Sequence, residues 1–291
     1  MFGRVITAMA TPFAADGSLD LTRARELAAH LVANGSDGLV VCGSTGESPV
    51  LSFEEKRDLI GAVADEVGAR GDVIAGTGTY DTRASIALSQ TAAEQGAAGL
   101  LVVTPYYSRP PQSGLLAHFT AIAESVDRPV ILYDIPSRTA RKIDHETLLA
   151  LAAVPNIVGV KDAAGDLAGT AKLIAEKPDD FTIWSGDDAL TLPMLALGAH
   201  GVISVASHLA GNRIADMIAT FVKGDTEGAA AIAAELAPLF EVLFITSNPI
   251  PLKAALAMMG QPVGEPRLPL VPATEAQRSQ VRAVLEGLGL L

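Results

Sequence analysis

The residues Ile157-Val-Gly-Val-Lys161 form a short apolar run, and an Ala- and Leu-rich run follows at Ala168–Glu176. The short run does not alternate between apolar and polar residues, so it predicts a strand that is buried on both faces. The longer run predicts a helix. A buried strand followed by a helix is the repeating unit of a parallel sheet.

The same unit recurs along the chain as far as Lys223. We predict eight strands, at Arg4–Ala8, Gly38–Cys42, Asp72–Ala75, Gly99–Val103, Val130–Tyr133, Ile157–Lys161, Thr182–Trp184 and Gly201–Ser204. We predict helices at Thr22–Ala33, Phe53–Val67, Thr82–Gln95, Gly114–Val126, His145–Ala152, Ala168–Glu176, Leu190–Leu197 and Ile214–Val222. Eight units favour a closed (β/α)8 TIM barrel over an open doubly wound sheet. No Gly-x-Gly-x-x-Gly motif follows the first strand, which removes the usual dinucleotide signature of the open sheet.

The pattern changes to helices alone after Lys223. These helices are predicted at Thr226–Ile245, Ile250–Met259 and Thr274–Leu288, with an extended linker at Gly260–Pro269. We therefore expect two parts, a catalytic barrel at residues 1–224 and a C-terminal helical domain at residues 225–291.

Composition narrows the class of partner. The formal net charge is -12, and a surface this acidic repels nucleic-acid phosphates and anionic lipids. No apolar run of about 18 residues is present, so no membrane span is expected. The one cysteine, Cys42, lies in an apolar run and is interpreted as a core residue. A single cysteine fits a reducing compartment, and no secretory leader is recognisable, so we expect a cytoplasmic protein.

The lysine at the end of the sixth strand is the sharpest chemical signal. In TIM barrels the chemistry lies at the carboxyl ends of the strands. Burial disfavours the charged form of Lys161, and a neutral amine is the form that attacks a ketone. The alternative is a solvent-facing lysine that opens a helix at Asp162–Asp166, where a positive charge is unfavourable. Lys161 is thus predicted to be the nucleophile of a Schiff-base lyase.

Three other strand ends carry polar side chains. Gly43–Glu47 places two hydroxyls between glycines, which suits a small carboxylate ligand, although a plain turn with a helix cap has the same composition. Thr104–Tyr107 ends in two tyrosines that could equally serve packing or an interface. Tyr133 can relay protons and Arg138 can bind a carboxylate with two hydrogen bonds, although arginine is also a common surface ion-pair partner.

Asp187 and Asp188 follow the seventh strand and raise the question of a metal site. They have no histidine or further acidic ligand nearby in the sequence, so we expect them to form hydrogen bonds or cap a helix. The five histidines show no metal-ligand spacing. No metal site is therefore predicted.

Four features together resemble the dihydrodipicolinate synthase/N-acetylneuraminate lyase family, namely Gly43–Glu47, Tyr133, Lys161 and Asn248–Pro251. The resemblance extends along nearly the whole chain, from Thr7–Phe13 to Ser247–Lys253. It implies a TIM barrel with a C-terminal helical extension, assembled as a homotetramer. It also implies that no cofactor is needed, because an imine supplies the electron sink.

The resemblance also implies a role for each residue. Lys161 forms an imine with pyruvate, and the resulting enamine attacks an aldehyde. The residues implied in proton relay are Ser44, Tyr133 and Tyr107, of which Tyr107 enters the site of the neighbouring subunit. The residues implied in substrate binding are Thr45, Arg138, Gly186 and Ile203, with Thr45 on the pyruvate carboxylate.

Arg138 distinguishes the branches of this family. The synthase branch uses an arginine here to bind the carboxylate of L-aspartate 4-semialdehyde, which implies condensation of that aldehyde with pyruvate in lysine and diaminopimelate biosynthesis. A sister aldolase that acts on sialic acid or a 2-keto-3-deoxy sugar acid is the first alternative. An inactive keto-acid-binding relative is the second, and the intact Lys161 and Tyr133 disfavour it. Ser44 and Asp134 are departures, since most synthases have Thr and Asn there.

The same resemblance bears on regulation by lysine. Lysine-inhibited synthases hold lysine with imidazole, amide and acidic side chains. This chain has Phe53 and Lys56 at the two histidine positions, and Tyr80 and Ala84 at the Asn and Glu positions. A lysine ligand would lose its Glu partner and meet Lys56, with a repulsion of roughly 3–4 kcal/mol at about 4–6 Å. We therefore expect little feedback inhibition by lysine.

Overall fold

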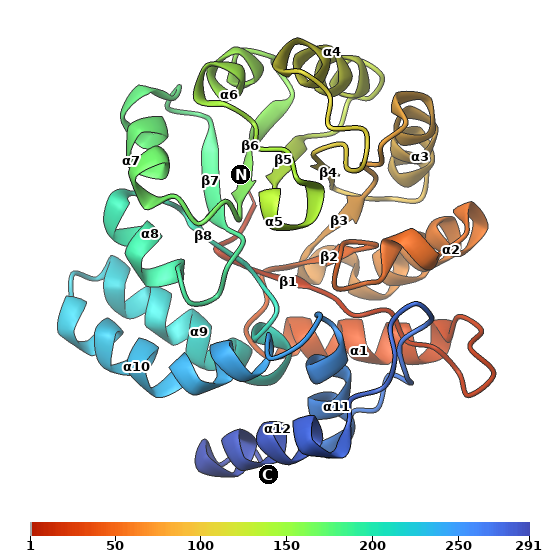
Figure 1. Cartoon of the computed structure of the whole chain (residues 1–291), viewed down its shortest axis with the longest axis vertical. Helices are drawn as coiled ribbons and strands as arrows, with labels where there is room; N and C mark the ends of the chain where they lie inside the picture. Colours follow the sequence, from red (N-terminus) through yellow and green to blue (C-terminus); the bar gives the residue numbers. More distant parts are fainter. Residues whose placement is uncertain (1) are drawn as a thin grey trace.

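The computed structural model describes residues 2–291 and contains one closed barrel of eight parallel strands (Figure 1). The strands are β1 (Val5–Ala8), β2 (Gly38–Val41), β3 (Asp72–Gly76), β4 (Gly99–Val103), β5 (Val130–Asp134), β6 (Ile157–Asp162), β7 (Thr182–Ser185) and β8 (Gly201–Ser204). The barrel closes because β8 pairs with β1, with Ile203 opposite Ile6. The predicted TIM barrel is confirmed, and the open sheet is excluded.

Helices surround the barrel on all sides (Figure 1). The outer ring contains α1 (Leu21–Ala33), α2 (Phe53–Val67), α3 (Thr82–Glu94), α4 (Gln112–Ala123), α6 (His145–Ala152), α7 (Leu167–Glu176), α8 (Thr191–Leu197) and α9 (Ser207–Val222). A one-turn helix, α5 (Pro136–Thr139), was not predicted, because four residues are too few to show a helical period. It begins with a proline, which suits the first position of a helix. Helix α9 begins before the predicted Ile214 and is kinked at Ala210.

The side chains of the strands alternate between two apolar layers, as the pleat of a strand requires. The barrel interior contains Ile6, Ala8, Val40, Ile74, Leu101, Ile131, Tyr133, Trp184 and Ile203. The other faces of the strands pack against the helices, where Val130 and Leu132 of β5 are buried. Tyr133 and Lys161 are register partners on the inner face. Strands that are apolar throughout are therefore explained by burial on both faces.

Three helices follow the barrel, α10 (Thr226–Val242), α11 (Ile250–Met258) and α12 (Glu275–Gly287). They lie together beside α9 and α1 (Figure 1). Leu239, Leu252 and Leu285 belong to the same apolar cluster as the barrel helices. The proposed boundary between residues 224 and 225 stays a prediction. Among residues 2–291, no helix is both long enough and apolar enough to cross a membrane.

Two expectations about polar side chains are confirmed. Cys42 is 1% exposed, and burial raises the pKa of its thiol to about 12, which keeps it protonated. Asp188 accepts hydrogen bonds from the Ser204 hydroxyl and from the backbone N–H groups of the next two residues. Asp187 accepts one from the backbone of Ala189. Both aspartates thus form hydrogen bonds that fix the turns after β7 and β8.

Asp134 lies at the end of β5, opposite Asp162 of β6 in the register, and is 2% exposed. Burial raises the pKa of Asp134 to about 7, and the charge of Asp162 acts in the same direction. The Asp134 carboxyl also accepts a hydrogen bond from the Ile143 N–H at 3.2 Å. The folded protein therefore keeps Asp134 protonated at a pH where the unfolded chain ionises it.

This shift gives a pH-dependent prediction for Asp134→Asn. The raised pKa means that the stabilising contribution of Asp134 is complete below pH 4 and is lost as the pH rises through about 7. Asparagine can accept the same hydrogen bond without ionising. We expect the variant to unfold with a free energy about 2–4 kcal/mol higher than the wild type at pH 8. Urea unfolding at several pH values measures the difference.

The gain should shrink toward zero at pH 4, because both side chains are then neutral. Asp187→Asn, at an exposed aspartate that also accepts a backbone hydrogen bond, serves as the control for exchanging a carboxylate for an amide. A gain of equal size at pH 4 and pH 8 would show that the titration of Asp134 is not its cause.

Candidate active site

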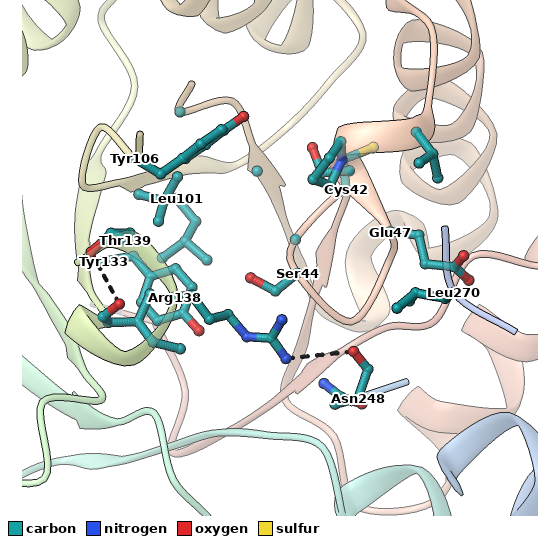
Figure 2. Close-up of a pocket in the computed structure, with 18 of the residues that line it drawn as sticks. Cys42, Ser44, Glu47, Leu101, Tyr106, Tyr133, Arg138, Thr139, Asn248 and Leu270 are labelled. Carbon is teal, nitrogen blue, oxygen red and sulfur yellow. Dashed lines mark hydrogen bonds between the residues drawn. The ribbon is translucent and has the colours of Figure 1, made fainter. Parts of the chain in front are cut away.

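A cavity of about 320 Å³ opens at the carboxyl ends of β2 to β5. Its lining residues include Ser44, Tyr106, Tyr133, Arg138 and Asn248, which are labelled in Figure 2, and also Arg267. The first four follow or end strands of the barrel, and the last two come from the C-terminal helical part. This is the end of a TIM barrel that carries active sites, so the cavity is the candidate site.

Lys161, near the end of β6, does not itself line this cavity, but it lies beside Tyr133, which does. Lys161 is 5% exposed, and its Nζ lies 4.3 Å from the centroid of the Tyr133 ring. Lys161 takes part in none of the nine ion pairs found among residues 2–291. Lys161 is therefore a buried amine beside an aromatic ring, at the end of the barrel where active sites lie.

Gly186 leaves the space that the Lys161 side chain occupies. A Cβ at this position would lie 3.1 Å from the Lys161 Cε and 2.7 Å from the Ala163 Cβ. Ile203 is 1% exposed and shares the interior cluster with Tyr133. Neither residue is among those that line the cavity, and of the two only Gly186 makes room for the Lys161 side chain.

The loop after β2 carries the two hydroxyls. Ser44 is half-buried and lines the cavity, whereas Thr45 is 3% exposed. The Thr45 Oγ1 accepts a hydrogen bond of 2.9 Å from the side-chain amide of Asn248. Because the amide occupies a lone pair of the hydroxyl, the hydroxyl hydrogen of Thr45 stays free to donate to another acceptor.

Asn248 also approaches Arg138. The Arg138 Nη2 donates to the Asn248 carbonyl oxygen over a long distance of 3.5 Å, drawn as a dashed line in Figure 2. Sequence reasoning included Asn248 in the family motif but gave it no role. The motif was the only available signal, because Thr45 lies 203 residues from Asn248 in the chain.

The two tyrosines after β4 face different ways. Tyr106 lines the cavity and meets the ring of Tyr80 edge-on at 5.3 Å, and burial raises the pKa of Tyr106. Tyr107 is 94% exposed, has a φ of 70° and does not line the cavity of its own chain. The structure therefore brings Ser44, Tyr133 and Arg138 to one cavity and leaves Tyr107 outside it.

Known proteins resemble this chain over its whole length. The model of the dihydrodipicolinate synthetase family matches residues 1–288. A 4-hydroxy-tetrahydrodipicolinate synthase of Thermosynechococcus vestitus is 56% identical, and the match covers 100% of this chain and 98% of the relative. A crystal structure of the Cyanidioschyzon merolae enzyme with lysine bound has a TM-score of 0.98, at 46% identity, and the match covers 100% of this chain and 99% of that one.

A structure described as a monomeric dihydrodipicolinate synthase variant is similarly close, with a TM-score of 0.97 and 39% identity over 100% of this chain and 98% of that one. The sequence prediction of a lyase from this family is confirmed by these full-length matches. This chain belongs to the dihydrodipicolinate synthetase family.

Proposed function

We propose that the protein condenses pyruvate with L-aspartate 4-semialdehyde, the 4-hydroxy-tetrahydrodipicolinate synthase reaction, in the cytoplasmic biosynthesis of diaminopimelate and lysine. The observation that carries this proposal is the buried Lys161 amine beside Tyr133, next to a cavity that also presents Arg138. The names of the full-length relatives support the same reaction.

The chemistry begins with the Lys161 amine attacking the ketone carbon of pyruvate. Water leaves, an imine forms, and loss of a methyl proton gives an enamine. The enamine carbon bonds to the aldehyde carbon, whose oxygen takes a proton. The amino group of the former aldehyde then attacks the imine carbon, which closes the ring and releases Lys161.

Two contacts would hold the substrates. The free hydroxyl hydrogen of Thr45 would donate to the pyruvate carboxylate, since Asn248 already donates to its oxygen. Arg138 is exposed at the cavity and would bind the carboxylate of the aldehyde with two charge-assisted hydrogen bonds. Each carboxylate thereby has its own donor.

The proton relay is proposed to contain Ser44, Tyr133 and the Tyr107 of a second subunit. Tyr107 is 94% exposed and does not line its own cavity, which suits a side chain that reaches a neighbouring copy. We therefore propose an assembly of identical chains, a homotetramer in the complete form. Light scattering together with the activity of Tyr107→Phe would test both statements.

A substrate panel tests the proposed reaction directly. The purified protein is incubated with pyruvate and, separately, L-aspartate 4-semialdehyde, N-acetylmannosamine or a short sugar aldehyde. Product formation with the semialdehyde alone is expected, because only this aldehyde offers Arg138 a carboxylate. A preference for a sugar aldehyde would identify a sister aldolase, and pyruvate binding without an adduct would identify a binding protein.

Feedback inhibition by L-lysine is predicted to be weak. Phe53 and Tyr80 are 43% and 62% exposed and offer no charge to an ammonium group, and Lys56 brings a like charge. The repulsion of roughly 3–4 kcal/mol is nearly as large as the free energy of millimolar binding, about -4 kcal/mol. The rate with saturating substrates should therefore stay above half its maximum at about 1 mM L-lysine.

The double variant Lys56→His and Ala84→Glu tests the reason for this insensitivity. It removes the like charge and supplies a carboxylate, so it should become more sensitive to L-lysine than the wild type. Half-inhibition of the wild type below about 1 mM L-lysine would show that another residue, such as Asp81, replaces the missing partner.

A further inference from the structure

The loop with the two hydroxyls ends at a fully buried ion pair that the mechanism above does not use. Glu47 follows this loop, and Lys253 lies in α11. Their side chains are both 1% exposed, and the Lys253 Nζ lies 2.7 Å from the Glu47 Oε1. The other carboxylate oxygen of Glu47 accepts a hydrogen bond of 2.9 Å from the backbone N–H of Arg267. In Figure 2, Ser44 lies between Glu47 and Arg138.

Each partner of this pair is held on several sides. The Lys253 Nζ lies 4.3 Å from the centroid of the Phe13 ring and donates to the Glu265 carbonyl oxygen at 3.4 Å. Burial lowers the pKa of Lys253, and the neighbouring Glu47 carboxylate opposes that shift. Because taking two charges out of water is costly, a buried ion pair adds little net stability over apolar side chains of similar size. Stability alone therefore does not explain why Glu47 and Lys253 form a buried ion pair here.

The backbone conformation of Glu47 suggests what the ion pair does. Its φ is 55°, in the left-handed region that residues other than glycine seldom occupy. A conformation of this kind persists only where surrounding contacts enforce it. The carboxylate contacts with Lys253 and Arg267 hold the Glu47 side chain, and they add to the backbone hydrogen bonds that Glu47 makes within its own turn.

The loop is therefore tied to the C-terminal helical part at two points that are close together. Asn248, two residues before α11, donates to Thr45, and Lys253 in α11 pairs with Glu47. Thr45 and Glu47 are only two residues apart. A shift of Glu47 away from α11 would move the Thr45 hydroxyl relative to the Asn248 amide.

We propose that Glu47 and Lys253 are positioning residues for pyruvate binding. They hold the loop against α11, so that Thr45 keeps its hydrogen bond with Asn248 and presents its hydroxyl hydrogen to the pyruvate carboxylate. This inference rests on the proposed function, because pyruvate is the ligand assigned to Thr45. It concerns the affinity for pyruvate, not the chemistry at Lys161.

The test compares Glu47→Gln, Lys253→Met and the double variant. Sodium borohydride traps the pyruvate imine, and mass spectrometry gives the pyruvate concentration for half-maximal trapping. Each variant should raise that concentration about tenfold or more, the scale of a lost hydrogen bond to a charged group. The double variant should recover the wild-type Tm, because it leaves no unpaired buried charge, but it should keep the raised pyruvate requirement.

Glu55→Gln is the matched control. It breaks the neighbouring ion pair between Glu55 and Arg267, while glutamine preserves the capping box at the start of α2. The control should lower Tm without changing the pyruvate concentration for half-maximal trapping. With saturating pyruvate, kcat of the Glu47 and Lys253 variants should stay close to the wild-type value.

The outcomes separate this inference from the proposed function. Absence of an adduct in the wild-type protein would reject the proposed reaction itself. A wild-type protein that traps pyruvate, with folded variants that need no more pyruvate than it does, would show that the ion pair is only structural. A fall in kcat at unchanged KM would also overturn the positioning role. If the single variants do not fold, the pyruvate concentration for half-maximal trapping in the double variant decides between a positioning and a purely structural role.

Discussion

Lys161→Ala is expected to lose the pyruvate adduct and to turn over at a rate lower by a factor of about 10⁴ or more, the scale seen when a covalent nucleophile is removed. The reason is that, among residues 2–291, Lys161 is the one lysine whose amine lies over the Tyr133 ring. The intact mass after borohydride reduction with pyruvate gives the first measurement, and steady-state kinetics gives the second.

The fold should survive this change, because Lys161 has no ion-pair partner among residues 2–291 that would be left with an unpaired charge. Lys161→Met controls for the volume that alanine leaves empty, and it should also form no adduct. Lys172→Ala, in α7 at the surface, controls for the loss of a lysine and should behave like the wild type. A normal adduct mass in Lys161→Ala would assign the nucleophile to another residue.

Arg138→Ala is expected to lower kcat/KM for L-aspartate 4-semialdehyde by about 30- to 900-fold, which corresponds to about 2–4 kcal/mol for a charge-assisted contact with two hydrogen bonds. Imine formation with pyruvate should change little, because Thr45 is the group assigned to the pyruvate carboxylate. Kinetics with the aldehyde varied, and borohydride trapping with pyruvate varied, measure the two effects separately.

Arg138→Lys provides the matched comparison. Lysine keeps the positive charge but loses the planar pair of donors, so an intermediate loss is expected. If Arg138→Ala kept the wild-type kcat/KM for the aldehyde, the arginine would have another role, and its contact with the Asn248 carbonyl would then be its main interaction.

The sequence by itself determined the barrel and placed Lys161, the proposed nucleophile, near the end of a strand. The strands β4 and β8 and the helices α2 and α6 have the predicted bounds. Both strands are short apolar runs that begin at a glycine, and α2 begins after its cap Ser52 and ends before Gly68. All strands of a parallel barrel have their carboxyl ends on the same side. A residue near the end of any strand, such as Lys161, therefore lies on the side of the barrel that carries active sites.

The tertiary structure alone decided which residues surround the proposed site. Nothing in the local sequence distinguishes Tyr106 from Tyr107. In the structure Tyr106 lines the cavity, whereas Tyr107, with a φ of 70°, is 94% exposed. The contacts of Thr45 with Asn248 and of Glu47 with Lys253 join residues that are more than 200 positions apart. The local sequence pattern indicates which residues are buried and whether they form a helix or a strand. Contacts of this kind form only when the C-terminal helices pack against the barrel.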